Sequence, residues 1–307
     1  MSNCLITKLK GIVNNPSLPK IDELVIQVNR NTALYIDSSI SCRVVNGYFS
    51  NESFSTNLGT SMDSNSGTIF VTGGSTLFLS PKNEIGRLWG GGNSSVTINV
   101  EDLAYIHNNA VVQWMSGCVV GNIDALKNKP FYVFDAQDNP GLYGNLSSIL
   151  NPNITIIGLL RTAVKGNVSD FINCKSLEGN VSMPPKISGD LSIFNSEFPN
   201  VTMLTSENSS PDYILTGDIS KLNSKIEFLS FSGHTTNFTW KGTKRGKIIA
   251  CSNCNFGNDL DAFLNNMAEL EAGRYNWINV IGTRTSASDA AVATLQQKGY
   301  TVSVTPA

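Results

Sequence analysis

The stretch that decides the fold runs Ile157-Gly158-Leu159-Leu160-Arg161-Thr162-Ala163-Val164-Lys165-Gly166-Asn167-Val168-Ser169. The alternating apolar residues Ile157 and Leu159 predict a short strand with one buried face. Thr162 follows at a position where an inward polar side chain can bond to the backbone of a turn. Gly166-Asn167 then predicts a second turn, because glycine and asparagine tolerate positive φ.

The same phrase recurs between Val112 and Leu260. Its copies end at Gly121-Asn122, Gly144-Asn145, Gly189-Asp190, Gly217-Asp218 and Asn258-Asp259. From Gly121 to Gly189 the glycines are spaced by 23, 22 and 23 residues. A fixed period in the twenties predicts a solenoid, in which stacked coils complete one continuous core.

This spacing resembles the leucine-rich repeat, whose consensus carries Asn, Cys or Thr at the polar site. Asn139, Thr162 and Cys254 occupy that site in three copies. Gly117 departs from the pattern, and the longer intervals after Gly189 imply insertions. The resemblance therefore implies an irregular solenoid of roughly six or seven coils.

The remainder of the chain suggests two flanking parts. We expect a small β-module over residues 1–95, the solenoid over 96–257 and an α/β cap over 258–307. The elements expected in the flanking parts are an extended arm around Pro16 and Pro19, strands over 24–28, 33–37, 68–72 and 76–79, a glycine-rich joint over 89–95, a strand over 95–100, a helix over 259–270, a strand over 277–281, a helix that begins near Ser286 and ends at Gly299, and a strand over 300–304. The predicted fold class is mainly β with some α.

Composition narrows the possible functions. The chain has 307 residues, of which 15% are charged, and a net charge of −2. This balance argues against general nucleic-acid binding. The one compact basic run, Lys241, Lys244, Arg245 and Lys247, is short enough to be a solvated loop, and whether it has a partner stays open.

The N-terminus lacks the pattern of a secretory leader, and no stretch is apolar for long enough to span a membrane. We therefore expect synthesis in the cytoplasm. The six cysteines are expected to be reduced, and Cys251 and Cys254 fall on inward positions of the repeat.

A search for catalytic chemistry finds few candidates. The two histidines, His107 and His234, match no triad motif and are expected to be structural. The pairs Asp135 with Asp138 and Asp259 with Asp261 could in principle serve a glycosidase, but a turn explains the first pair better and helix capping explains the second without catalysis. Cys251-Ser252-Asn253-Cys254 has no second CxxC to complete a zinc site, so we expect no metal and no cofactor.

The two ends of the chain carry a second resemblance. Cys4-Leu5-Ile6-Thr7-Lys8-Leu9-Lys10-Gly11, the run from Thr285 to Leu295, and Lys298-Gly299-Tyr300 resemble segments of small repeat proteins encoded by gut Bacteroidales and their tailed phages, including the crAss-like group. The resemblance implies a virion component, such as a head or tail fibre or a surface decoration.

Three hypotheses for function remain at this point. The first is a non-enzymatic virion protein that is anchored through residues 1–105 and presents the solenoid to a host-surface glycan or protein, or to other subunits. The second is a bacterial surface adhesin or glycan-binding protein, and the third is a polysaccharide-cleaving enzyme. Candidate binding residues are Trp89, Tyr143 and Trp240, because large aromatic side chains favour interfaces. A homo-oligomer is expected, with a trimer as the default.

Overall fold

The computed structural model describes residues 22–50, 57–59, 61–80, 82–90, 96–113, 117–208, 210 and 212–306. Strands predominate in this part of the chain and helices are few, which confirms a mainly β fold. The chain divides into two compact units, residues 1–142 and 143–307. The expected arm around Pro16 and Pro19 and residues 91–95 of the expected joint lie outside the described residues. The three-part division at 95 and 257 stays a prediction.

The first unit begins with an antiparallel assembly. Its elements are β1 (Leu24–Val28), β2 (Thr32–Val45), β3 (Phe49–Ser50), β4 (Asn57–Gly59), β5 (Ser61–Val71), β6 (Ser75–Ser80), the 3-10 helix η1 (Lys82–Glu84) and β7 (Arg87–Gly90). The long strand β2 pairs with β5, β6 and β7. Alternate residues such as Leu34 and Ile36 are fully buried, as half-buried strands require. The four strands predicted here fall on β1, β2, β5 and β6.

Pairing changes from antiparallel to parallel at β8 (Val96–Asn99), which matches the predicted strand over 95–100. β8 pairs antiparallel with β1 and parallel with β10. The elements that follow are α2 (Val100–Leu103), β9 (Ala110–Gln113), β10 (Val119–Asn122), the 3-10 helix η2 (Ile123–Leu126) and β11 (Phe131–Asp135). Because β9 pairs parallel with both β7 and β11, parallel stacking is established within this unit. Trp114, which belongs to the first predicted copy, lies outside the described residues.

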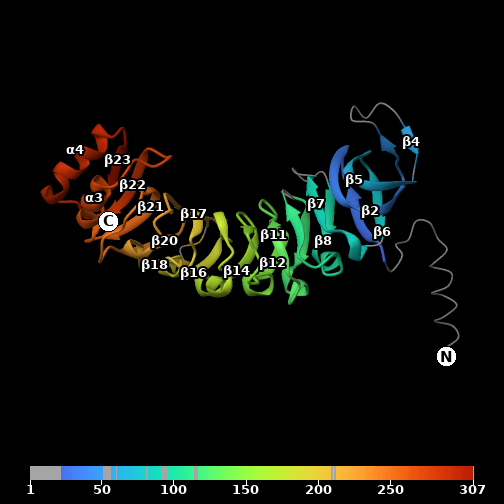
Figure 1. Cartoon of the computed structure of the whole chain (residues 1–307), viewed down its shortest axis with the longest axis horizontal. Helices are drawn as coiled ribbons and strands as arrows, with labels where there is room; N and C mark the ends of the chain where they lie inside the picture. The colour runs from blue at the N-terminus through green and yellow to red at the C-terminus, as the bar shows by residue number, and fades with distance from the viewer. Residues whose placement is uncertain are drawn as a thin grey trace. The chain divides into compact units, whose positions relative to one another are not determined.

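The second unit contains two parallel ladders (Figure 1). The first ladder pairs β13 (Ile156–Gly158), β15 (Glu178–Ser182), β17 (Asn200–Glu207), β19 (Phe228–Ser232) and β21 (Ala250–Gly257). The second pairs β12 (Leu142–Asn145, which begins at the last residue of the first unit), β14 (Ala163–Asn167), β16 (Lys186–Asp190), β18 (Ile214–Asp218) and β20 (Thr235–Thr239). Strands of the two ladders alternate along the chain. One copy of the repeated phrase therefore covers one strand of the first ladder and the second-ladder strand that follows it.

The C-terminal elements match the prediction closely. They are α3 (Leu260–Glu269), β22 (Trp277–Gly282), the 3-10 helix η7 (Ser286–Ser288), α4 (Asp289–Gln297) and β23 (Thr301–Thr305). β22 and β23 extend the first ladder in parallel. Phe263, Leu264 and Met267 on α3 are fully buried, so this helix packs one apolar face inward.

The turns after the second-ladder strands differ from the prediction. They are the short 3-10 helices η3 (Leu146–Ser148), η4 (Val168–Asn173), η5 (Leu191–Ile193) and η6 (Ile219–Lys221). Gly217 has φ of +130°, but Asp218 is extended and its side chain accepts a hydrogen bond from the Ser220 amide at 3.2 Å. Gly144, Gly189 and Gly217 have positive φ, whereas Gly166 does not. Asn167, Asp190 and Asp218 each accept a hydrogen bond from the amide two residues further on, but Asn145 does not cap its turn.

Inward polar side chains satisfy backbone groups, which confirms the predicted role of Asn139 and Thr162. The Asn139 amide donates to the carbonyls of Ala136 and Gln137 at 2.8 and 2.9 Å and accepts from the Val119 amide at 2.6 Å. Thr162 donates to the Leu159 carbonyl at 2.9 Å.

Asn223 has the same role, which its sequence position did not indicate. Its side chain donates to the carbonyls of Phe198 and Val201 at 2.9 and 3.1 Å. Buried amides therefore secure turns at several levels of the repeat.

Candidate functional site

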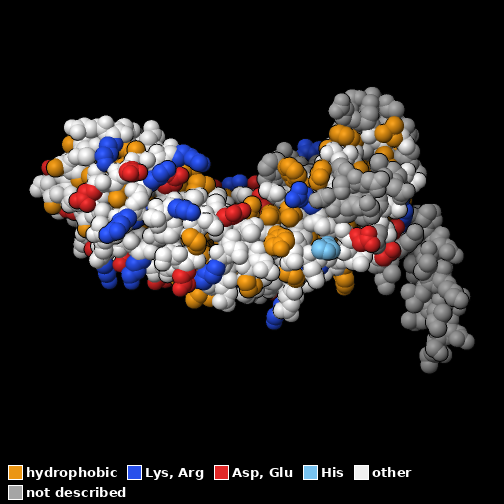
Figure 2. Space-filling view, in the orientation of Figure 1, with side chains coloured by type: hydrophobic (Ala, Val, Ile, Leu, Met, Phe, Trp, Pro, Cys, Tyr) orange, Lys and Arg blue, Asp and Glu red, His pale blue; other side chains and the backbone are white. Residues whose placement is uncertain are grey.

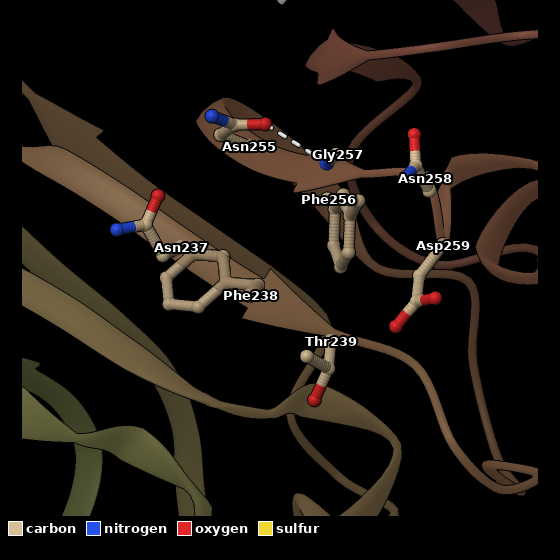
Figure 3. Close-up of a pocket in the computed structure, with 8 residues that line it drawn as sticks. All are labelled: Asn237, Phe238, Thr239, Asn255, Phe256, Gly257, Asn258 and Asp259. Carbon is tan, nitrogen blue, oxygen red and sulfur yellow. Dashed lines mark hydrogen bonds between the residues drawn. The ribbon is translucent and has the colours of Figure 1, made fainter.

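A cleft of about 280 Å³ lies where the end of β21 runs past β20. Figure 3 shows its eight lining residues, three from β20 and five from the end of β21 and the turn after it. They are Asn237, Phe238, Thr239, Asn255, Phe256, Gly257, Asn258 and Asp259. Phe238 and Phe256 are almost fully buried and form the apolar floor. Amide, hydroxyl and carboxylate groups surround this floor.

Some polar groups of the cleft already form hydrogen bonds within the protein. Asn255 accepts a hydrogen bond from the Gly257 amide at 2.9 Å, and Asp259 accepts one from the Trp240 amide at 2.9 Å. Asp259 is the single carboxylate among the eight lining residues. Hydrolysis of a glycosidic bond normally uses a pair of carboxyl groups, so the lining fits hydrogen bonding to a small polar group better than catalysis.

A second candidate site is an exposed aromatic cluster on the outward side of the first ladder. Phe228, Tyr275 and Trp277 lie with ring centroids 4.7, 5.4 and 5.9 Å apart. Ala250 pairs with Phe228 on the first ladder and is fully buried, and β22, which begins at Trp277, pairs with the same strand β21. The Tyr275 hydroxyl reaches back to the Met203 sulfur at 3.0 Å. Trp277 remains 39% exposed.

A row of small polar side chains runs beside this cluster. Strand register aligns Thr205 with Ser230, Ser230 with Ser252 and Ser252 with Asn279. We call these four residues, with Met203, Phe228, Tyr275 and Trp277, the aromatic face. None of the strands β19, β21, β22 and β23 contains a charged residue or a histidine.

The three aromatic residues predicted as binding residues differ in how exposed they are. Tyr143 is 51% exposed and is available for contact. Trp89 is partly exposed and packs edge-to-face on Tyr35 with ring centroids 5.8 Å apart. The expectation of an accessible ring is wrong for Trp240, which is 5% exposed and packs on Phe263 at 5.2 Å. Its place after the buried Phe238 continues the inward alternation of β20.

Trp277 and Phe228 do not stand out in the sequence when each aromatic residue is considered by itself. The two-residue alternation of their strands contains the signal: Ile278 and Leu229 are fully buried, so Trp277 and Phe228 must point outward. Their mutual contact depends on the pairing of β19 with β21 and of β21 with β22, which no local pattern encodes.

His234 is largely buried and lies 2.8 Å from the hydroxyl of Ser206. Burial lowers the pKa of its imidazole. Ser206 is fully buried and also donates to the Pro184 carbonyl at 3.0 Å, so this pair packs in the interior and faces no cleft. His107 is exposed on the first unit.

Cys251 and Cys254 are fully buried, as expected from their inward positions. Burial raises the pKa of the Cys251 thiol well above its usual value. Five cysteines are free thiols, and Cys4 lies outside the described residues.

Lys244 of the basic run is 2% exposed, with its ammonium 3.3–3.4 Å from three backbone carbonyls. Burial lowers its pKa to about 8. The expectation of a solvated loop therefore fails at this position.

The acidic pairs have structural partners. Asp135 accepts a hydrogen bond from Gln137 at 2.9 Å, and Asp138 adopts the positive φ of a turn. The expected capping of α3 by Asp259 is wrong, because its carboxylate accepts from Trp240 instead. Asp261 accepts hydrogen bonds from Thr285 and Ser288, which ties α3 to the segment that leads into α4.

No protein family, curated protein or solved structure matches the chain. Among the described residues, no three His, Cys, Asp or Glu side chains gather as a metal site would require. None of the helices in the described ranges has the length and apolar character needed to cross a bilayer.

Proposed function

We propose that this chain is a non-enzymatic structural and adhesion component of a bacteriophage virion, as a head or tail fibre or a surface decoration. The observation that carries the proposal is the aromatic face, in which the exposed Trp277 packs against the partly exposed rings of Phe228 and Tyr275 beside a row of small polar side chains. Large aromatic side chains at the centre of a surface patch are typical of binding sites.

The proposal includes the interpretation of residues 96–257 as an irregular leucine-rich-repeat-like solenoid. The two parallel ladders, the 3-10 turns and the period of 22–23 residues support it. Stacked coils give a rigid, extended surface on which side chains keep fixed spacings. Such a surface loses little conformational entropy when it binds a partner.

The placement on a virion rests on the resemblance of the two chain ends to Bacteroidales and phage repeat proteins. In this proposal residues 1–105 contact other virion proteins, the chain forms a homo-oligomer, with a trimer as the default, and the second unit faces the host surface or a neighbouring subunit. A bacterial surface adhesin is the alternative, because the aromatic face would serve it equally well.

The test is mass spectrometry of density-banded phage particles against an uninfected-host control. Stoichiometric recovery of the chain in the particle band is expected. Recovery with cell envelopes, and absence from particles, would replace the virion component with a bacterial adhesin.

A further inference from the structure

We infer that the aromatic face binds an uncharged polysaccharide, with Trp277 as the platform on which a sugar ring stacks. This inference rests on the proposed function and names the ligand class of its contact surface.

The rings are fixed before any ligand arrives. Tyr275 lies 4.7 Å from Phe228 and 5.4 Å from Trp277, and its hydroxyl is held by Met203. Trp277 stands on β22, which is paired on both sides by β21 and β23. A pyranose ring presents a face of C–H bonds, and this face complements the electron-rich face of an aromatic ring. An exposed, preorganised indole is suited to such stacking.

The polar row supplies the second half of sugar recognition. Ser230, Ser252 and Asn279 lie in register on successive strands. Their side chains form no hydrogen bond with any other described residue. Hydroxyl and amide groups both donate and accept, which matches the hydroxyl groups at the edge of a sugar ring. Their spacing follows the ladder, about 4.8 Å per strand, so several groups can contact one extended chain.

The charge distribution selects an uncharged ligand. The 24 residues of β19, β21, β22 and β23 include no charged side chain. The one charged residue of β17, Glu207, pairs with Arg161 at 2.7 Å. Elsewhere on the second unit, positive and negative side chains are interspersed over the visible face (Figure 2). At the border of the aromatic face, Glu227 is neutralised by Lys247 at 3.7 Å and accepts from the Arg274 amide at 3.2 Å. A nucleic acid, an acidic glycan or a charged peptide would find no opposite charge on these strands.

The experiment measures retention of the full chain in native gels that contain dextran, mannan, galactan or the neutral polysaccharide extracted from host cells. Alginate and heparin serve as charged comparators. We expect retention by at least one neutral polymer, unchanged between low and high salt, because no ion pair contributes. Trp277→Ala should weaken this retention by about tenfold, and Trp277→Phe by less, because a ring remains.

Tyr105→Ala is the matched control, since Tyr105 is an aromatic residue of the first unit that is more exposed than Trp277, at 60% against 39%. The Lys82 ammonium lies 4.3 Å from the centroid of its ring. Circular dichroism and thermal unfolding of each variant establish that folding is intact. Three results would each overturn the inference: no retention by any neutral polymer, equal loss in the Tyr105 and Trp277 variants, or retention by alginate or heparin alone.

Sedimentation of the same variants tests whether the aromatic face is instead an interface between copies of this chain. If Trp277→Ala turns an oligomer into a monomer while neutral polymers retain neither protein, the aromatic face is an interface between copies and the glycan inference fails. In that case the proposed virion function stands or falls separately, on recovery of the chain in banded particles.

Discussion

Asn139→Ala should destabilise the first unit by about 3 kcal/mol. The Asn139 side chain is 1% exposed and bonds to the Val119 amide and to the carbonyls of Ala136 and Gln137. Residue 137 is partly exposed, so its carbonyl can find water after the substitution, whereas Val119 N–H and Ala136 C=O are left buried and unpaired. Each such group costs about 1–3 kcal/mol, which gives the total.

The assay is hydrogen exchange of individual amides during urea unfolding. It reports the stability of each region separately, which is needed because two compact units can unfold independently. The Val119 amide should exchange about 100-fold faster in Asn139→Ala, the kinetic equivalent of about 3 kcal/mol. Thr162→Val removes the hydroxyl that donates to the Leu159 carbonyl and accepts weakly from the Val164 amide, and should cost about 1 kcal/mol in the second unit. The exposed Asn276→Ala should change stability by less than about 0.5 kcal/mol. A loss for Asn139→Ala no larger than that of the exposed control would refute the reasoning.

Three further predictions concern buried charge, backbone conformation and a side-chain tether. The pKa of Lys244 is lowered by burial from 10.5 to about 8, so the folded protein binds fewer protons than the unfolded chain between these values and its stability rises with pH there. The free energy of unfolding of Lys244→Met relative to that of the native protein, measured by urea unfolding, should fall by about 3 kcal/mol from pH 7 to 10.5. A pH-independent difference would contradict this prediction. Gly233 has φ of +72°, and an added Cβ would lie 1.7 Å from the Asn208 carbonyl oxygen, whereas Gly179 has φ of +63° and open space around it. Gly233→Ala should therefore lower the melting temperature well beyond Gly179→Ala. Equal losses would show that only the backbone φ matters. Asp261→Ala should cost about 1–2 kcal/mol at neutral pH by releasing Thr285 and Ser288. Partial desolvation raises the pKa of Asp261, but hydrogen bonds from Ser288 and Thr285 lower it overall. The contribution of Asp261 to stability is therefore lost as pH falls through its folded pKa. If Asp261→Ala cost as much stability in acid as at neutral pH, these hydrogen bonds would not be the cause.

The sequence pattern predicted those features that depend only on residues close together in the chain. The alternation around Ile157 and Leu159 gave a strand, and the polar sites at Asn139 and Thr162 satisfy backbone groups as expected. These features follow from short-range geometry and from the requirement that buried polar groups be paired.

Features that depend on contacts between segments far apart in the sequence were not predictable in the same way. Asp259 was expected to cap the helix that follows it, but its carboxylate accepts a hydrogen bond from the backbone amide of Trp240, the residue just after β20. Asn223 bonds to carbonyls more than 20 residues away. The aromatic face likewise exists because strand pairing brings Phe228, Tyr275 and Trp277 together.

The most direct test of the central claim is binding of the fluorescently labelled full chain to Bacteroidales host cells, measured by flow cytometry. The native protein and the double variant Phe228→Ala/Trp277→Ala are compared at matched folding, with Tyr105→Ala as the control. We expect saturable binding by the native protein and the control, and a loss of at least about tenfold in the double variant. Equal binding by all three proteins, or no binding by any of them, would contradict the claim that this chain contacts a cell surface through its aromatic face.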